Sequence, residues 1–276
     1  MTRVRDELIE MRGLRFHYRD WPGRRADAQD LVLLHGYTGH ARSWDALAEA
    51  MSADYRVLAL DQRGHGESGW APRDAYGTPE MVEDLAAFAA ALGLKHFALL
   101  GLSMGGIVSF AYAGRRPAEL ARLVIVDIAP EIGAQGLKNI QSNVSRSDVF
   151  DSREAAFARA RADNPIPPEA HHRHRVDNSL MRTDDGRWTY RYDRALRDPT
   201  NRREAIPVDE GWRLAGNITV PTLLIRGELS DILSVEVARR FMETVPDCRL
   251  IEVAGSGHPV PLDKPDEFLA AVQTFL

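Results

Sequence analysis

The sequence predicts one α/β protein built on a doubly wound, mostly parallel sheet of eight strands flanked by helices. Short apolar runs of strand length recur along the 276 residues, and segments with the apolar periodicity of helices separate them. This alternation stops once, between about residues 130 and 217, where the chain has no apolar strand run. Residues 1–129 and 218–276 are therefore expected to form the core. Residues 130–217 are expected to form an insertion of helices over the carboxyl edge of the sheet.

The elements before the interruption follow in order. Residues 7–20 alternate loosely around Gly13, which predicts two short antiparallel strands joined by a turn. The continuous apolar run of residues 31–34 is typical of a strand buried on both faces, and a helix is expected over residues 43–51. Thr78 and Pro79 open a later helix as a capping residue and a first-turn proline, and Gly93 ends it. Further strands are expected at residues 55–60, 97–102 and 123–126.

The alternation resumes after residue 217, with strands at residues 222–225 and 249–253 and helices at about residues 235–245 and 265–275. Right-handed crossovers between such units produce a parallel sheet. The interrupting segment is rich in Arg, His, Asp and Pro, but residues 131–210 hold 14 Lys and Arg against 14 Asp and Glu. Its stretch HHRHR at residues 171–175 is therefore expected to be a solvated helix face rather than a metal site.

Composition argues against several classes of function. The net charge of -5 does not supply the basic face that nucleic-acid binding needs, and no basic amphipathic helix suits a membrane surface. Residues 1–11 hold no apolar run of signal-peptide length, and the single cysteine, Cys248, cannot form an internal disulfide. We expect a cytoplasmic monomer or homodimer whose partner is a small-molecule substrate.

The motif GLSMG at residues 101–105 is the strongest local signal for chemistry. An apolar strand run leads directly into Ser103, and small and apolar residues then recur at helical spacing. A serine between a strand and a helix stands on a strained turn that exposes its hydroxyl, and glycines two residues before and after allow the close chain approach. Ser103 is therefore the candidate nucleophile.

The carboxyl ends of the other predicted strands deliver the partners that a nucleophilic serine needs. Ligands bind at this edge of an open parallel sheet. The strands end at residues 35–39, at the polar loop 61–68, at Asp127, at the turn 227–231 and at His258. A serine, candidate acids and a histidine in this chain order are typical of serine hydrolases. The loop 61–68 is expected to fix the sheet edge through side-chain hydrogen bonds to the backbone.

Four motifs together resemble the α/β-hydrolase fold superfamily over nearly the whole chain outside the interruption: HGYTG at 35–39, DQRGHGES at 61–68, GLSMGG at 101–106 and GSGHPVPLDKP at 255–265. The resemblance implies that residues 130–217 form the cap that shapes substrate choice. It also implies an oxyanion hole made of the backbone amides of Tyr37 and Met104. His258 is expected to accept the Ser103 proton, because serine is a poor nucleophile at its free pKa.

The acid of the triad has two candidates. Many family members carry it three residues after the glycine that ends the strand following the cap, but here that position is Ser230, and Asp231 comes one residue later. Asp127, in the segment VDIAP, ends the preceding strand and looks like the acid of subgroups that carry such a segment. We favour Asp127 and keep Asp231 as the alternative.

The expected reaction is hydrolysis of a small carboxylic ester or lactone, or an amide, through an acyl-serine intermediate, with no metal or organic cofactor. A carbon-carbon hydrolase of the meta-cleavage type and a small-molecule receptor on the same fold are the alternatives. A cap arginine such as Arg146 or Arg191 could clamp a substrate carboxylate, since guanidinium matches carboxylate in a bidentate way. The remaining histidines, His17, His40 and His96, are expected at the surface.

Overall fold

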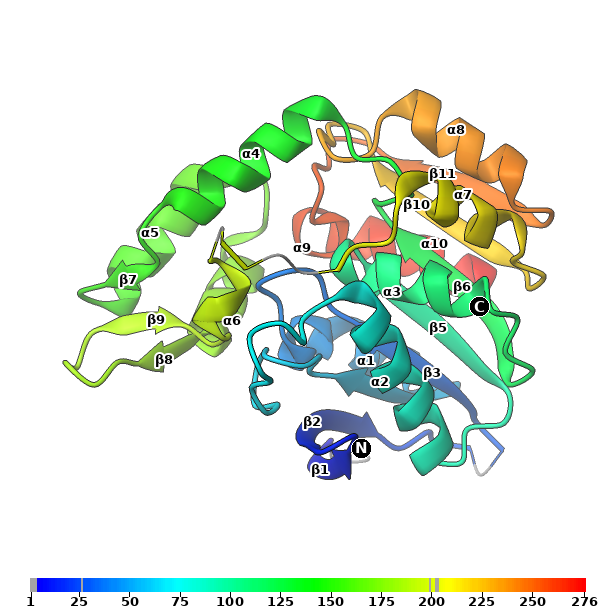
Figure 1. The fold of residues 1–276 in the computed structure, drawn as a ribbon, viewed down its shortest axis with the longest axis horizontal. Coiled ribbons are helices and arrows are strands. Elements are labelled where there is room, and N and C mark those ends of the chain that lie inside the picture. Colours follow the sequence, from blue (N-terminus) through cyan, green and yellow to red (C-terminus); the bar gives the residue numbers. More distant parts are fainter. Residues whose placement is uncertain (1–3, 26, 199, 202–203) are drawn as a thin grey trace.

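The structure is a computed structural model that describes residues 4–25, 27–198, 200–201 and 204–276 (Figure 1). An eight-stranded sheet in the order β1-β2-β4-β3-β5-β6-β10-β11 forms its centre, as the sequence predicts. The first two strands are antiparallel to their neighbours and the other six run parallel. The strands are β1 (Arg5–Met11), β2 (Leu14–Trp21), β3 (Gln29–Leu34), β4 (Tyr55–Leu60), β5 (Phe97–Leu102), β6 (Leu120–Val126), β10 (Thr222–Gly227) and β11 (Cys248–Val253).

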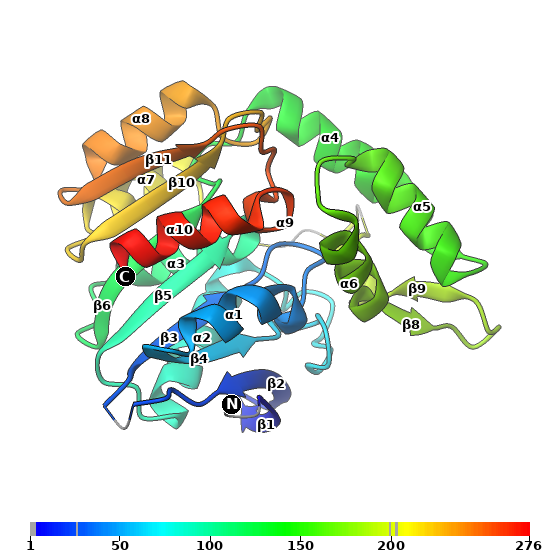
Figure 2. The ribbon, with the colours of Figure 1, turned by 180° about the vertical axis from the view of Figure 1, so that it is seen from behind.

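Helices cover both faces of this sheet, which explains the unbroken apolar runs of its central strands. Two large apolar clusters result, one on each face. Figure 1 shows one helical layer in front of the sheet, and Figure 2 shows the other from behind. The front layer holds α2 (Thr78–Ala91), α3 (Met104–Ala113), α7 (Val208–Gly216) and α8 (Val235–Thr244), and the other holds α1 (Asp45–Met51), the short α9 (Val260–Asp263) and α10 (Pro265–Phe275).

The expected elements agree closely with the observed ones in the core. Strands β4 and β5 and helix α10 have the expected bounds. Strand β6 begins three residues earlier than expected, because Leu120 pairs with Phe97 across an irregular step in the register. Gly13 at the β1–β2 turn and Gly93 after α2 both have positive φ, 75° and 64°, which favours glycine at these turns.

The strand order reverses around β3, because the chain passes from β3 to β4 on one side and returns to β5 on the other. The crevice at such a reversal is where open α/β sheets bind ligands. The parallel register aligns Leu34 with Gly101 and Val126 with both Leu102 and Ile225. The residues that follow these strands therefore emerge level at one edge of the sheet.

The segment between β6 and α7 crosses this edge and stands beside the core (Figure 1). Its helices are α4 (Ala134–Ser145), α5 (Arg153–Asp163) and α6 (Glu169–Ser179), followed by a short 3-10 turn, η2 (Arg194–Leu196). The expectation of helices alone is wrong, because β7 (Val149–Phe150), β8 (Leu180–Arg182) and β9 (Trp188–Tyr190) form a three-stranded antiparallel sheet. Strands of two or three residues are too short to show a period-two pattern.

Helix α7 lies inside the residue range assigned to the cap, yet it packs on the core. Trp212 and Ala215 of this helix belong to the same apolar cluster as Phe241 of α8. We therefore propose that the cap comprises the segment before α7, from about residue 130 to 207. Within the described ranges, no helix is long and apolar enough to cross a membrane.

Candidate active site

The turn between β5 and α3 carries Ser103 in a strained conformation, with φ 52° and ψ -115°. Its amide still donates to the Val126 carbonyl at 3.0 Å, so the turn remains tied to the sheet. The neighbouring glycines have no room for a side chain. A Cβ on Gly101 would lie 2.2 Å from the Gly105 carbonyl oxygen, and a Cβ on Gly105 would lie 2.4 Å from that of Leu34. The GLSMG pattern is thus required by backbone contact.

Asp127 follows β6 and lies fully buried beside the end of β10. Its Oδ2 is 2.7 Å from Nδ1 of His258, its Oδ1 accepts the Gly227 amide at 2.9 Å, and Ser230 Oγ also donates to Oδ2. Its φ of 52° is in the left-handed region, which aspartate tolerates better than most residues. The carboxylate is therefore oriented by three donors, one of them the imidazole.

Asp231, the alternative acid, lies elsewhere. Its side chain accepts a hydrogen bond from Asn139 of α4. The preceding residue, Ser230, instead faces Asp127, and its Oγ also accepts the amides of Ile232 and Leu233 at 3.2 Å each. Of the two candidates, the geometry brings Asp127 to His258 and leaves Asp231 at the base of the cap.

His258 is held by a loop that packs tightly against the sheet. A Cβ on Gly227, at the end of β10, would lie 2.1 Å from the Gly257 carbonyl oxygen. The Gly257 amide donates to Asp263 at 2.8 Å, and Asn164 of the cap donates to the same carboxylate at 2.7 Å. Since Nδ1 faces Asp127, a proton on Nδ1 leaves Nε2 of His258 as the acceptor. Sequence reasoning missed the Asn164 contact, which joins residues 99 positions apart.

The loop after β3 approaches the nucleophile from the other side. A Cβ on Gly36 would lie 3.2 Å from Cβ of Ser103. The ring of His35 orients this loop, because its Nδ1 lies 2.8 Å from the Gly36 carbonyl while its Nε2 accepts the Gln62 amide at 3.0 Å. Burial lowers the pKa of His35 to about 4, so the ring is neutral. Met104 begins α3, where the first amides of a helix have no intrahelical partner and attract negative charge.

The loop after β4 supports the site without entering the large cavity beside it. Asp61 accepts the amides of Ala41 at 2.6 Å and Glu67 at 2.9 Å, which confirms the expected bracing of the sheet edge. His17 was expected at the surface, but it is 2% exposed, with Nδ1 at 2.7 Å from the Asp61 carboxylate. Although burial opposes it, the His17 hydrogen bond helps lower the Asp61 pKa to about 2. An alternating strand pattern cannot show that a neighbouring loop covers its polar side chain.

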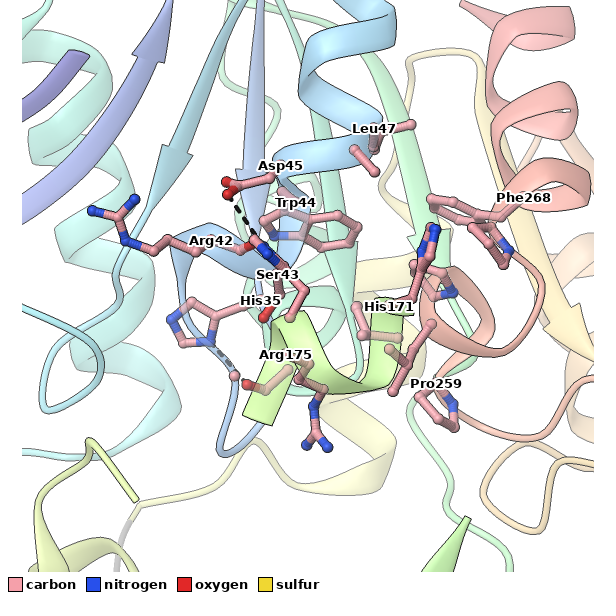
Figure 3. A pocket seen from close by; sticks show the side chains of 18 of the residues that line it. His35, Arg42, Ser43, Trp44, Asp45, Leu47, His171, Arg175, Pro259 and Phe268 are labelled. Atoms are coloured by element: carbon pink, nitrogen blue, oxygen red, sulfur yellow. Dashed lines mark hydrogen bonds and ion pairs between the residues drawn. The ribbon is translucent and has the colours of Figure 1, made fainter. Parts of the chain in front are cut away.

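A cavity of about 770 Å³ opens at this edge, and Ser103 and His258 both line it (Figure 3). Away from these two residues its walls are largely apolar. The rings of Trp44 and Phe268 stack with centroids 6.4 Å apart, and Leu47 lies beyond Trp44. Helix α6 of the cap contributes a further part of the wall. A nucleophile, a base and an apolar recess therefore share one cavity, which suits a small organic substrate.

Comparison with known proteins agrees with this geometry. The sequence model of the α/β-hydrolase fold matches residues 31–265. The chain belongs to the α/β-hydrolase fold family. It is 28% identical over 281 residues to a 3-hydroxybutyrate-oligomer hydrolase of Cupriavidus necator, covering 98% of this chain and 96% of that protein. It is 26% identical to a 2-(acetamidomethylene)succinate hydrolase of Mesorhizobium japonicum, covering 89% of this chain and 87% of that protein.

Among solved structures, an α/β hydrolase from Novosphingobium aromaticivorans superposes with a TM-score of 0.89 at 29% sequence identity, covering 100% of this chain and 98% of that one. The expected fold class and the expected family are therefore confirmed, and the protein is a hydrolase.

The cap of this α/β hydrolase contributes the basic stretch at residues 171–175, which was expected to be a solvated helix face. That expectation is only partly right, because the side chains of this stretch project from α6 in different directions. Arg173 is exposed and lies over the Phe157 ring at 4.0 Å. His172 is buried in the cap, and burial lowers its pKa to about 4. His171, His174 and Arg175 line the large cavity. His174 and Arg175 follow His171 by three and four positions, which places all three on one face of a helix. This spacing is the sequence signal that could have predicted their shared position.

The two cap arginines suggested as carboxylate clamps lie away from the cavity that Ser103 lines. Arg146 pairs with Asp163 at 3.0 Å. Arg191 donates to the Leu180 carbonyl at 3.2 Å and borders a separate polar pocket of about 100 Å³. In the described part of the α/β hydrolase, no cluster of three or more His, Cys, Asp or Glu side chains could hold a metal ion.

Proposed function

We propose that this protein is a serine hydrolase that cleaves a small carboxylic ester or lactone through an acyl intermediate on Ser103. The observation that carries the proposal is the 2.7 Å contact between Asp127 Oδ2 and His258 Nδ1, beside the cavity that Ser103 lines. An aspartate in this position fixes the tautomer and orientation of the imidazole and stabilises the imidazolium that forms during attack.

In the first step, Nε2 of His258 takes the hydroxyl proton as Ser103 Oγ bonds to the substrate carbonyl carbon. The carbonyl electrons move onto oxygen, where the amides of Tyr37 and Met104 donate to the developing charge. The tetrahedral intermediate then expels an alcohol that receives the proton from His258. Water, activated by the same imidazole, hydrolyses the acyl-enzyme and restores Ser103.

Two further observations favour an ester-type bond. The Cupriavidus necator relative is named for hydrolysis of 3-hydroxybutyrate oligomers. The cavity that Ser103 lines also has apolar side chains in its wall, among them Trp44, Leu47 and Phe268, against which an acyl or alkyl chain could pack. An amide is the related alternative, because both reactions pass through a tetrahedral intermediate that the same donors stabilise.

The test is turnover of short-chain p-nitrophenyl esters together with labelling by a fluorophosphonate probe. Wild-type protein is expected to turn over esters and to be labelled at Ser103, and Ser103→Ala is expected to lose both. Ser142→Ala, on the exposed face of α4, is the control and should keep both. Absence of labelling at Ser103 would overturn the proposal. Labelling without sustained turnover of esters, lactones or amides would favour a receptor or a carbon-carbon hydrolase.

A further inference from the structure

We propose that the substrate carries a carboxylate and that the guanidinium of Arg175 binds it inside the cavity. This inference rests on the proposed function, because it concerns what the same site accepts. Arg175 was not among the arginines that the sequence singled out. It is half-buried on the face of α6 that lines the cavity, one helical turn after His171.

The charge of Arg175 is uncompensated, unlike that of Arg42 and His174 in the same wall. Arg42 pairs with Asp6 at 2.9 Å, and His174 pairs with Asp45 at 3.3 Å. Across the described part of the chain, no carboxylate lies within ion-pair distance of the Arg175 guanidinium, and no oxygen accepts a hydrogen bond from it. A half-buried guanidinium has five donors to satisfy, and a bidentate carboxylate matches two of them.

Arg175 lines the same cavity as Ser103 and His258. In Figure 3, Leu47 is at one end and Arg175 is at the other, with Trp44 between them, and the guanidinium points away from Leu47. Pro259, the neighbour of His258, lies at the same end as Arg175. Burial lowers the pKa of His40 to about 4; the Asp61 carboxylate opposes this shift and the Arg175 charge adds to it. His40 directly follows the loop that presents Tyr37.

A polar relay ties the backbone of Arg175 to the core. Nε2 of His40 lies 3.0 Å from Ser179 Oγ, and that hydroxyl donates to the Arg175 carbonyl at 2.6 Å. Since the Ser179 proton is used in the second bond, Nε2 of His40 is the donor in the first. The relay links His40, which follows the loop of residues 35–39, to the backbone of Arg175 in α6.

The charge distribution of the cavity would also orient such a substrate. Asp45, Glu49 and Asp266 lie in its wall, and the last two are exposed. Because like charges repel, a carboxylate is disfavoured near these acids and favoured at Arg175. The apolar surface of Trp44, Leu47 and Phe268 is left for the uncharged part of the molecule.

The experiment compares matched esters that differ in charge. For a carboxylate on the acyl side, the substrates are monoethyl adipate, ethyl hexanoate and ethyl 6-aminohexanoate. For a carboxylate on the alcohol side, they are 4-acetoxybutanoate and butyl acetate. Wild-type kcat/KM is expected to be about ten- to a hundredfold higher for the anion than for its neutral analogue in one of the two series, the range that a charged hydrogen bond supplies.

Arg175→Gln should remove this preference, so that the ratio of kcat/KM for the anion to kcat/KM for its neutral analogue falls to about one. Arg175→Glu should reverse it in favour of the cation if the carboxylate is on the acyl side. Arg173→Gln removes the same charge from the outer face of α6 and should change neither value. The absence of a wild-type preference for the anion in both series, or a preference unchanged by Arg175→Gln, would overturn the inference.

A second readout does not depend on turnover. Adipate should slow fluorophosphonate labelling of Ser103 more strongly than hexane-1,6-diol does, and Arg175→Gln should lose that difference while still being labelled. Equal protection by the acid and the diol in wild type would count against the carboxylate site and leave the serine hydrolase intact. If wild-type Ser103 is not labelled at all, the proposal that the protein is a serine hydrolase is itself overturned.

Discussion

The edge of the sheet and helix α6 of the cap face the same cavity but are built by different forces. At the sheet edge, Ser103 and Asp127 follow buried strands, and backbone contacts leave no space for a Cβ at Gly101 or Gly105. On α6, His174 and Arg175 are placed by helical spacing and by polar contacts with the core. The groups proposed for catalysis, which must meet within hydrogen-bonding distance, therefore lie on the closely packed edge of the sheet. The groups proposed to select the substrate lie on helix α6 of the cap.

The apolar packing of the core is also more extensive than that of the cap. The core has a large apolar cluster on each face of the sheet, whereas the cluster inside the cap has five buried members among the residues that the structure describes: Phe150, Ala156, Ala160, Val176 and Leu180. Arginines lie over the cap's aromatic rings, with Arg159 at 4.1 Å from the Phe150 centroid and Arg182 at 4.3 Å from that of Trp188. Cation–π contacts at or near the surface each contribute about 0.5–1 kcal/mol. The cap should therefore tolerate substitution better than the sheet edge.

The largest effect should come from the acid at the sheet edge. Asp127→Asn is expected to lower kcat for p-nitrophenyl esters by about 10³- to 10⁴-fold, because the amide cannot hold the tautomer of His258 that accepts a proton. Asp231→Asn, which alters a contact with the cap, should leave kcat nearly unchanged. Thermal melting of both variants checks folding, and equal effects on kcat would break the distinction between the two acids.

The second-largest difference between the sheet edge and the cap should come from glycine substitutions, because the two regions leave different amounts of space for a Cβ. Gly105→Ala is expected to cost about 3 kcal/mol of unfolding free energy, because its Cβ would press on a strand carbonyl that cannot move. Gly186→Ala, in the β8–β9 turn, meets nothing within 4 Å and should cost only about 1 kcal/mol for its positive φ. Urea denaturation measures both values. A similar cost at the two sites would show that the sheet edge is more adaptable than its contacts indicate.

Acid should weaken the core through its buried histidines. His40 is 3% exposed, and burial lowers its pKa to about 4 from 6.5, so the unfolded chain binds the proton more readily between these values. The contribution of neutral His40 to the unfolding free energy is therefore complete above pH 6.5. It is lost as the pH falls toward 4, by up to about 1.4 kcal/mol per pH unit. His40→Gln should flatten the fall in unfolding free energy over this window. An unchanged slope would mean that His40 is not the residue that titrates.

The smallest effect should come from the pair of His174 in the cap and Asp45 in the core. Its contribution to stability should depend on pH in the opposite direction to that of His40. Its hydrogen bond with Asp45 raises the pKa of His174, so this pair stabilises the fold below pH 6.5 and is lost as the pH rises through the folded-state pKa. Because His174 is half exposed, His174→Gln should cost less than about 1 kcal/mol at pH 6 and almost nothing at pH 9. Unfolding free energies at the two pH values check this difference.

Sequence reasoning predicted the sheet well, because strands buried on both faces leave continuous apolar runs and their helices leave a clear period. It also predicted that Ser103, Asp127 and His258 meet at one edge, since parallel strands share their carboxyl ends. It failed for His17 and His40, because burial of a polar side chain depends on a loop or a cap from elsewhere in the chain. The small sheet of the cap was missed because its strands have at most three residues.

The amino-acid sequence alone determined the fold class, the family and the residue types gathered at the carboxyl edge, because periodicity and glycine spacing are local properties of the chain. Only the tertiary structure shows that Asp127 contacts His258 whereas Asp231 contacts Asn139, since a one-residue offset on a turn changes which carboxylate faces the imidazole. It alone also brought Arg175 to the cavity in place of Arg146 or Arg191. Which face of a cap helix meets the core depends on packing between distant segments, and no local pattern records it.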